Sequence, residues 1–128
     1  MLRSYTHMHT GSLTTHVLDT SRGAPASGMQ VELWYLGVVG EGKQFLKKVV
    51  TNADGRTDGP LLAGDQFRVG EYELVFGVGH YFEASGRGDV EPPFLNEVPV
   101  RFGISDANAR YHIPLLVSPF AYSTYRGS

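Results

Sequence analysis

Short stretches in which apolar residues alternate with other residues recur along the chain, and this pattern limits the fold more than any other sequence feature. In LTTHVLD (13–19), Leu13 and Val17 share one face of an extended chain, while His16 lies on the opposite face. A period of two is typical of a half-buried β-strand. The pattern and β-rich composition predict strands at 13–19, 29–36, 44–51, 71–78, 98–104, 110–117 and 120–125.

Clusters of Gly, Pro, Asn and Asp separate these stretches. The 16 glycines and seven prolines fit many tight turns better than long helices. Seven short strands joined in this way predict an all-β fold, an antiparallel β-sandwich. GHYFEASG (79–86) is the exception, and it predicts one short helix closed by Gly86. We expect a single domain over residues 1–128, with residues 1–11 as a flexible lead-in.

Charge and composition argue against several classes of partner. Eleven basic and 13 acidic residues give a net charge of −2 with no basic cluster, so we expect no nucleic-acid partner. No apolar run approaches the roughly 20 residues of a membrane-spanning helix, so we expect no membrane partner. No secretory leader is visible, which favours a cytoplasmic protein, although a leader already removed would leave the same sequence. With no cysteine, thiolate catalysis, disulfides and cysteine-ligated zinc are excluded.

Two of the five histidines fall within predicted strands and are the candidates for acid–base chemistry. His16 shares a strand face with Thr14, and His112 shares one with Pro114. Imidazole is the side chain whose ordinary pKa, about 6.5, suits proton transfer near neutral pH. Taken alone, a histidine within a strand more often has a structural role, and spacing alone does not show whether the two meet.

Other motifs leave two interpretations open. His7 and His9 form an H-x-H pair that would need a third ligand to hold a metal, and none is specified. Arg56 follows a turn sequence, so it is either a solvated arginine or a fixed positive group for an anionic or carbonyl-rich ligand. Motifs for a nucleophilic serine or a nucleotide-binding loop are missing from the sequence.

Several stretches, taken in order, resemble one family. LTTHVLDTSRGAPASGMQVELW, TNADGRTDGPLL, GEYELVF and YHIPLLVSPFAYSTYRGS are similar to the 5-hydroxyisourate hydrolases of the transthyretin-like family. The resemblance covers residues 13–128, and its most specific part is the terminal YRGS. It implies a transthyretin-like (prealbumin-like) sandwich of two four-stranded sheets and a homotetramer built as a dimer of dimers. It also implies no cofactor and no metal.

The same resemblance implies a site for a small purine-derived substrate in the channel between the dimers. The reaction would be hydrolysis of 5-hydroxyisourate to 2-oxo-4-hydroxy-4-carboxy-5-ureidoimidazoline in urate degradation, by direct attack of water. The catalytic residues implied are His16, Arg56, His112 and Ser128, and the division of roles between the two histidines stays open. The residues implied to bind substrate are His16, Arg56, Tyr125, Arg126 and Gly127.

Two other classes of function compete with the hydrolase. A carrier would use the same channel to bind a hydrophobic small molecule, as transthyretin does, but His16, Arg56 and His112 make that channel polar. An interaction module would pair through exposed strand edges. Substitution of His16 separates the classes, because only a hydrolase should lose turnover while keeping its assembly.

Overall fold

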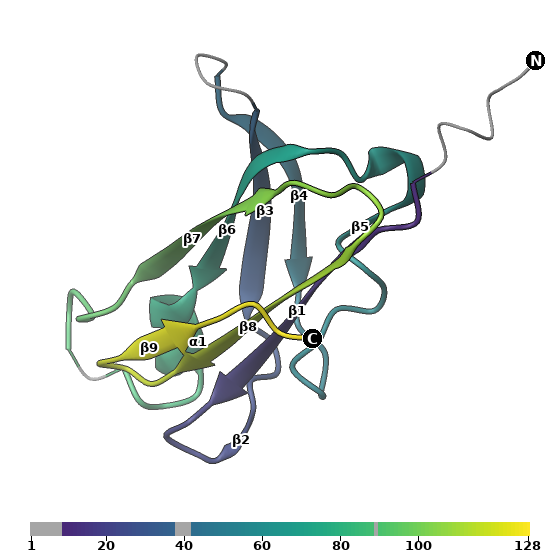
Figure 1. Ribbon diagram of the computed structural model, residues 1–128. Coiled ribbons are helices and arrows are strands. Elements are labelled where there is room, and N and C mark those ends of the chain that lie inside the picture. The colour runs from purple at the N-terminus through teal and green to yellow at the C-terminus, as the bar shows by residue number, and fades with distance from the viewer. Residues whose placement is uncertain (1–8, 38–41, 89) are drawn as a thin grey trace, which may run out of the picture.

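Two β-sheets packed face to face form the body of the molecule (Figure 1). The computed structural model describes residues 9–37, 42–88 and 90–128. Its elements, in chain order, are β1 (Ser12–Asp19), β2 (Ala24–Pro25), β3 (Gln30–Gly37), β4 (Gln44–Val50), β5 (Leu62–Ala63), the 3₁₀ turn η2 (Gly64–Gln66), β6 (Gly70–Gly77), α1 (Val78–Ala84), β7 (Glu97–Ile104), β8 (Arg110–Val117) and β9 (Tyr122–Thr124). All seven predicted strands and the predicted helix are therefore confirmed.

One sheet has the strand order β2-β1-β8-β9, with β5 also paired to β1, and the other has the order β4-β3-β6-β7. The first sheet thus holds five strands rather than the four expected, because the two-residue strands β2 and β5 both pair with β1. The sandwich is antiparallel except for β1 and β8, which pair in parallel. These two strands lie about a hundred residues apart in sequence, so no hairpin turn fixes their direction.

The alternation seen in the sequence sorts the side chains of each strand into a buried and a partly exposed set. In β1 every second residue is buried, and Leu13 and Val17 have no exposed surface. Leu33 of β3 and Leu74 of β6 face them from the other sheet and are likewise fully buried. Burying such side chains is worth about 1.5–3 kcal/mol each, so the core fixes the register of the strands. His16 consequently lies on the outer face.

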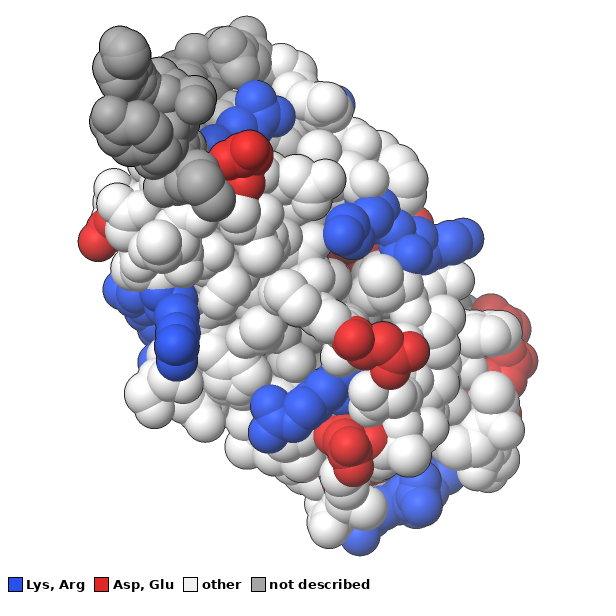
Figure 2. Space-filling view, turned by 90° about the vertical axis from the view of Figure 1, so that its right-hand side faces the viewer, with Lys and Arg blue, Asp and Glu red and all other residues white. Residues whose placement is uncertain are grey.

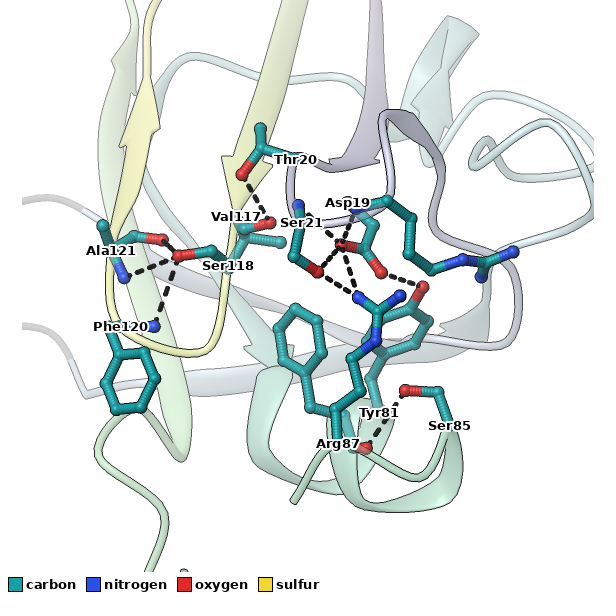
Figure 3. Close-up of polar contacts among 12 residues, drawn as sticks. Asp19, Thr20, Ser21, Tyr81, Ser85, Arg87, Val117, Ser118, Phe120 and Ala121 are labelled. Atoms are coloured by element: carbon teal, nitrogen blue, oxygen red, sulfur yellow. Dashed lines mark hydrogen bonds and ion pairs between the residues drawn. The ribbon is translucent and has the colours of Figure 1, made fainter. Parts of the chain in front are cut away.

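Helix α1 is tied to the end of β1 through the buried carboxylate of Asp19 (Figure 3). The hydroxyl of Tyr81, on α1, donates to Asp19 Oδ2 at 2.8 Å, and the Ser21 backbone N–H donates to Oδ1 at 3.0 Å. The guanidinium of Arg87 lies 3.7 Å from the same Oδ1. Burial acts to raise the pKa of Asp19, but hydrogen bonds from the hydroxyls of Ser21 and Tyr81, together with the charge of Arg87, outweigh it and lower the pKa from its ordinary value of 3.8.

The predicted end of the helix is confirmed in detail. Gly86 has a φ of 81°, the left-handed conformation that favours glycine. Its N–H donates to the Glu83 carbonyl, and the N–H of Arg87 donates to the Phe82 carbonyl. This pair of bonds is the Schellman arrangement, and it directs Arg87 back towards Asp19.

The expected flexible lead-in of residues 1–11 does not extend to its last three residues. The N–H of Gly11 donates to the Ala107 carbonyl at 3.1 Å, and the N–H of Thr10 donates to Asn108 Oδ1 at 3.2 Å. His9 is bonded to the Phe67 carbonyl. Residues 9–11 are therefore attached to the sandwich, while the rest of the predicted lead-in lies outside the described residues.

Positive and negative side chains alternate over the face shown in Figure 2. No broad patch of one sign forms on that face, in agreement with a net charge of −2. Within the described ranges, no helix has the length and apolar character needed to cross a membrane.

Candidate active site

The parallel pairing of β1 and β8 brings the two candidate histidines together on the outer face of their sheet. In the observed register Thr14 lies opposite His112, and His16 lies opposite Pro114. The centroids of the His16 and His112 rings are 6.5 Å apart. The histidines predicted separately on two strands therefore form one cluster.

Arg56 reaches this cluster because its turn docks against the edge of β1 between the positions paired with β5 and with β2. The Val17 N–H donates to the Gly55 carbonyl at 2.8 Å, and Arg56 pairs with His16 in an antiparallel bridge. Directly opposed residues in such a bridge point to the same face, so Arg56 shares the face of His16. Asn52 shapes the turn, because its Oδ1 accepts from the Arg56 N–H at 3.2 Å. Of the two interpretations of Arg56, the geometry favours the fixed positive group.

The C-terminal tail lies along β8 (Figure 1). Gly127 pairs with His112 in an antiparallel bridge. At the end of β9, Thr124 Oγ1 donates to the Pro114 carbonyl at 2.7 Å, and beyond the strand the Gly127 N–H donates to the His112 carbonyl at 2.8 Å. A Cβ on Gly127 would lie only 2.6 Å from His112 Cδ2. Glycine is thus required at this position for the tail to approach the imidazole.

The β8–β9 turn that starts the tail is fixed by Ser118 (Figure 3). The Ser118 N–H donates to the Ala121 carbonyl at 2.8 Å, and Ser118 Oγ accepts from the N–H groups of Phe120 and Ala121. These bonds explain why β9 begins at residue 122 rather than at residue 120, the predicted start.

Three of the predicted catalytic residues line one open hollow: Arg56, His112 and Ser128. Thr14 and His9 also line it. A second, apolar hollow lies near the other end of the sandwich, beside Phe94 and Phe120, and Arg87 is the charged residue in its lining. Of the histidines that the structure describes, His9 and His112 line the first hollow and none lines the apolar one, so we take the first hollow as the candidate site.

Tyr125 and Arg126, which were expected to bind substrate, do not line this hollow. The Tyr125 side chain is 60% exposed and is not part of the lining of the hollow. The guanidinium of Arg126 lies 4.0 Å from the ring centroid of Tyr111 and donates to the Arg110 carbonyl at 3.1 Å. Within this chain Arg126 therefore holds the tail against β8, through a cation–π contact and a hydrogen bond.

The environment of His112 favours its neutral form. Its half-buried position lowers the pKa of the imidazole below 6.5, and the nearby positive charges of Arg56 and His16 lower it further. A neutral imidazole can accept a proton at neutral pH, as a general base must.

Thr14 is a site residue that the sequence did not reveal. Its Oγ1 lies 2.8 Å from His112 Nδ1, so it fixes the ring and occupies one of its two nitrogens. When Nδ1 carries the proton and donates to Thr14, the lone pair of the neutral ring is on Nε2. Thr14 lies two residues before His16 on the same face, but only the parallel register shows that it meets His112.

The metal hypothesis for His7 and His9 gains no support. His7 lies outside the described residues, and Nδ1 of His9 is taken up by the Phe67 carbonyl at 2.6 Å. Among the residues that the structure describes, no three or more His, Asp or Glu side chains gather closely enough to hold a metal ion.

Comparison with known proteins places this fold and site in a family. The model of the HIUase/Transthyretin family matches residues 13–127. A 5-hydroxyisourate hydrolase of Mesorhizobium japonicum is 56% identical over 118 residues, which are 92% of this chain and 93% of that protein. The chain belongs to the HIUase/transthyretin family.

Solved structures agree with this placement. The structure of (S)-allantoin synthase matches with a TM-score of 0.88 and 46% identity, covering 94% of this chain and 44% of that one. This chain thus spans less than half the length of that protein. Klebsiella pneumoniae 5-hydroxyisourate hydrolase matches with a TM-score of 0.74 and 35% identity over 91% of this chain and 99% of that one. Sea bream transthyretin, solved with thyroxine, has a TM-score of 0.79 and 26% identity over 91% of this chain and 94% of that one. The predicted transthyretin-like sandwich is confirmed.

Proposed function

We propose that this chain is an enzyme that hydrolyses 5-hydroxyisourate to 2-oxo-4-hydroxy-4-carboxy-5-ureidoimidazoline in urate degradation, without a metal or an organic cofactor. The relative that is 56% identical over nearly the full length is a 5-hydroxyisourate hydrolase. The observation that carries the proposal is the meeting of Arg56, His112 and Ser128 in one hollow, with His16 beside them. This set offers a base, a fixed cation and hydroxyl groups for a hydrolysis.

His112 acts as the general base in this mechanism. Water attacks the amide-like ring carbonyl, and Nε2 of His112 takes its proton while Nδ1 is held by Thr14. The carbon–nitrogen bond then breaks, and the same proton passes to the departing nitrogen. The lowered pKa of His112 keeps the base neutral at physiological pH. Such a base contributes typically about 10²- to 10⁴-fold to the rate.

His16 and Arg56 support this base. The ring centroid of His16 lies 6.5 Å from that of His112, and this proximity contributes to the lowered pKa of His112. Arg56 stabilises the oxyanion that forms on the attacked carbonyl and orients the ring oxygens, a contribution usually worth a few kcal/mol.

The C-terminal tail completes the mechanism. Ser128 orients the attacking water, Gly127 lets the tail approach His112, and Arg126 anchors the tail on Tyr111. Tyr125 does not line the hollow of its own chain, so its substrate-binding role depends on the assembly proposed next.

We further propose a homotetramer, a dimer of dimers in which facing copies enclose the site. Large exposed aromatic side chains near the tail support this assembly, with Phe120 67% and Tyr125 60% exposed. Large apolar side chains exposed on a surface are candidates for burial in an interface. Sedimentation at micromolar concentration should give a tetramer, and a stable monomer with full activity would contradict the shared site.

The test of the reaction follows the ultraviolet absorbance of 5-hydroxyisourate generated in situ from urate. The wild-type chain should accelerate its decay, and Arg56→Ala and His112→Ala should each lower kcat/KM by about 100-fold or more. His80→Ala is the matched control, because His80 is exposed on α1 and away from the hollow. Decay at the spontaneous rate by folded protein that binds thyroxine would instead indicate a carrier.

A further inference from the structure

His9 lines the hollow together with Arg56, His112 and Ser128. It lies before residue 13, where the match to the family model begins, and no role follows for it from that match. The side chain is half-buried, so it forms part of the wall of the hollow rather than of the open surface.

The backbone from Thr10 to Ser12, which directly follows His9, is held by the sandwich. The Gly11 N–H donates to the Ala107 carbonyl at 3.1 Å, and a Cβ on Gly11 would lie 2.5 Å from that oxygen. Ser12 then opens β1, where it pairs with Ala63 of β5. The position of His9 relative to β1 is therefore determined by contacts on both sides of Gly11.

The hydrogen bond of His9 determines which of its ring nitrogens carries the proton and which is left free as an acceptor. Nδ1 lies 2.6 Å from the Phe67 carbonyl oxygen, which can only accept. Nδ1 must therefore carry the proton. In the neutral ring Nε2 then has the lone pair and acts as an acceptor.

His9 adds a nitrogen acceptor to a lining that also includes the hydroxyl groups of Ser12, Thr14 and Ser128. A purine-derived substrate presents carbonyl oxygens and ring N–H groups around its edge. Arg56 and Arg110, which both line the hollow, carry only donors on their side chains and serve the carbonyls. We propose that His9 is a substrate-binding residue that accepts a hydrogen bond from a ring N–H of the substrate through Nε2. This inference rests on the proposed hydrolase function.

The variant His9→Asn tests the proposal directly. The asparagine amide can keep the donor to Phe67, as Nδ1 does, but it has no group at the position of Nε2. Loss of one neutral hydrogen bond to substrate should raise KM about three- to tenfold and leave kcat within about twofold. His80→Asn is the matched control and should leave both constants unchanged. A KM within twofold of wild type in His9→Asn would overturn the proposal.

Long-range ¹H–¹⁵N NMR provides a readout that does not depend on turnover. The ¹⁵N shifts of His9 should report protonation at Nδ1, and urate, which keeps the purine rings of the substrate, should shift Nε2. A ring protonated only at Nε2, or urate that moves the His112 signals but not those of His9, would overturn the proposal. Absence of turnover by the wild-type chain would overturn the hydrolase function as well, whereas normal wild-type turnover with an unaffected His9→Asn variant overturns this inference alone.

Discussion

The variant Gly127→Ala tests how closely the tail must approach the proposed base. The added Cβ would lie 2.6 Å from His112 Cδ2 and 3.4 Å from Pro114 Cγ. Carbon atoms pack at about 3.5–4.0 Å, so either the tail or the imidazole must move by about 1 Å. The bond to Thr14 at 2.8 Å resists movement of the ring, and the bond from the Gly127 N–H to the His112 carbonyl resists movement of the tail.

Either displacement separates Ser128 from the His112 ring, and a misplacement of about 1 Å can cost about 100-fold in rate. We therefore expect kcat/KM of Gly127→Ala to fall by about 10- to 100-fold, or about 1.4–2.7 kcal/mol of activation free energy. The assay is the ultraviolet decay of 5-hydroxyisourate, combined with thermal unfolding to show that the fold is intact. Gly103→Ala is the matched control, because Gly103 lies on β7 in the other sheet and a Cβ there meets nothing within 4 Å. A kcat/KM of Gly127→Ala within twofold of wild type would refute the requirement for close approach.

Three further predictions follow from the site and its supports. In a pH–rate profile, the acid limb of kcat/KM should have its midpoint below pH 6.5, because the pKa of His112 is lowered. Arg56→Gln removes a positive charge that lowers this pKa, so the midpoint should move to higher pH. A midpoint that moves to lower pH would contradict this. Thr14→Val should lower kcat about tenfold, whereas Thr14→Ser should retain most activity, and equal loss in both would indicate packing rather than the hydrogen bond. The pKa of Asp19 is lower in the folded state than in the unfolded chain, so ionised Asp19 stabilises the fold fully above pH 3.8. This contribution to the free energy of unfolding is lost as the pH falls through the pKa of the folded state. Tyr81→Phe should therefore cost about 1.5–3 kcal/mol at pH 7 and less at pH 3 in urea unfolding, and a cost independent of pH would contradict the bond to a charged Asp19.

The sequence predicts the strands because their alternation reflects burial, which is a local property of each segment. The same alternation correctly placed His16 on the face opposite Leu13 and Val17. In the structure both His16 and His112 are partly buried. The end of α1 was also predictable, because a left-handed Gly86 is a local requirement. The strands β2 and β5 could not be predicted, because two residues are too few to show an alternating pattern.

Contacts between segments far apart in the chain account for what the sequence did not reveal. The turn at 52–56 was recognisable from its Asn, Asp and Gly, but nothing local indicated that Arg56 would pair with His16. The parallel register of β1 and β8 determines that Thr14 meets His112. Gly127 does not have the positive φ that requires glycine in a turn. Glycine is needed there because a Cβ would collide with His112, fifteen residues earlier in the chain.

The central claim is that the C-terminal tail, held against His112, forms part of a hydrolytic site. The most direct measurement compares the decay of 5-hydroxyisourate with the intact chain and with a chain lacking Gly127 and Ser128. The account predicts rapid decay with the intact chain and a rate close to the spontaneous one with the shortened chain, both folded to the same extent. Equal, rapid decay with both chains would contradict a role for the tail, and spontaneous decay with both would contradict the hydrolase itself.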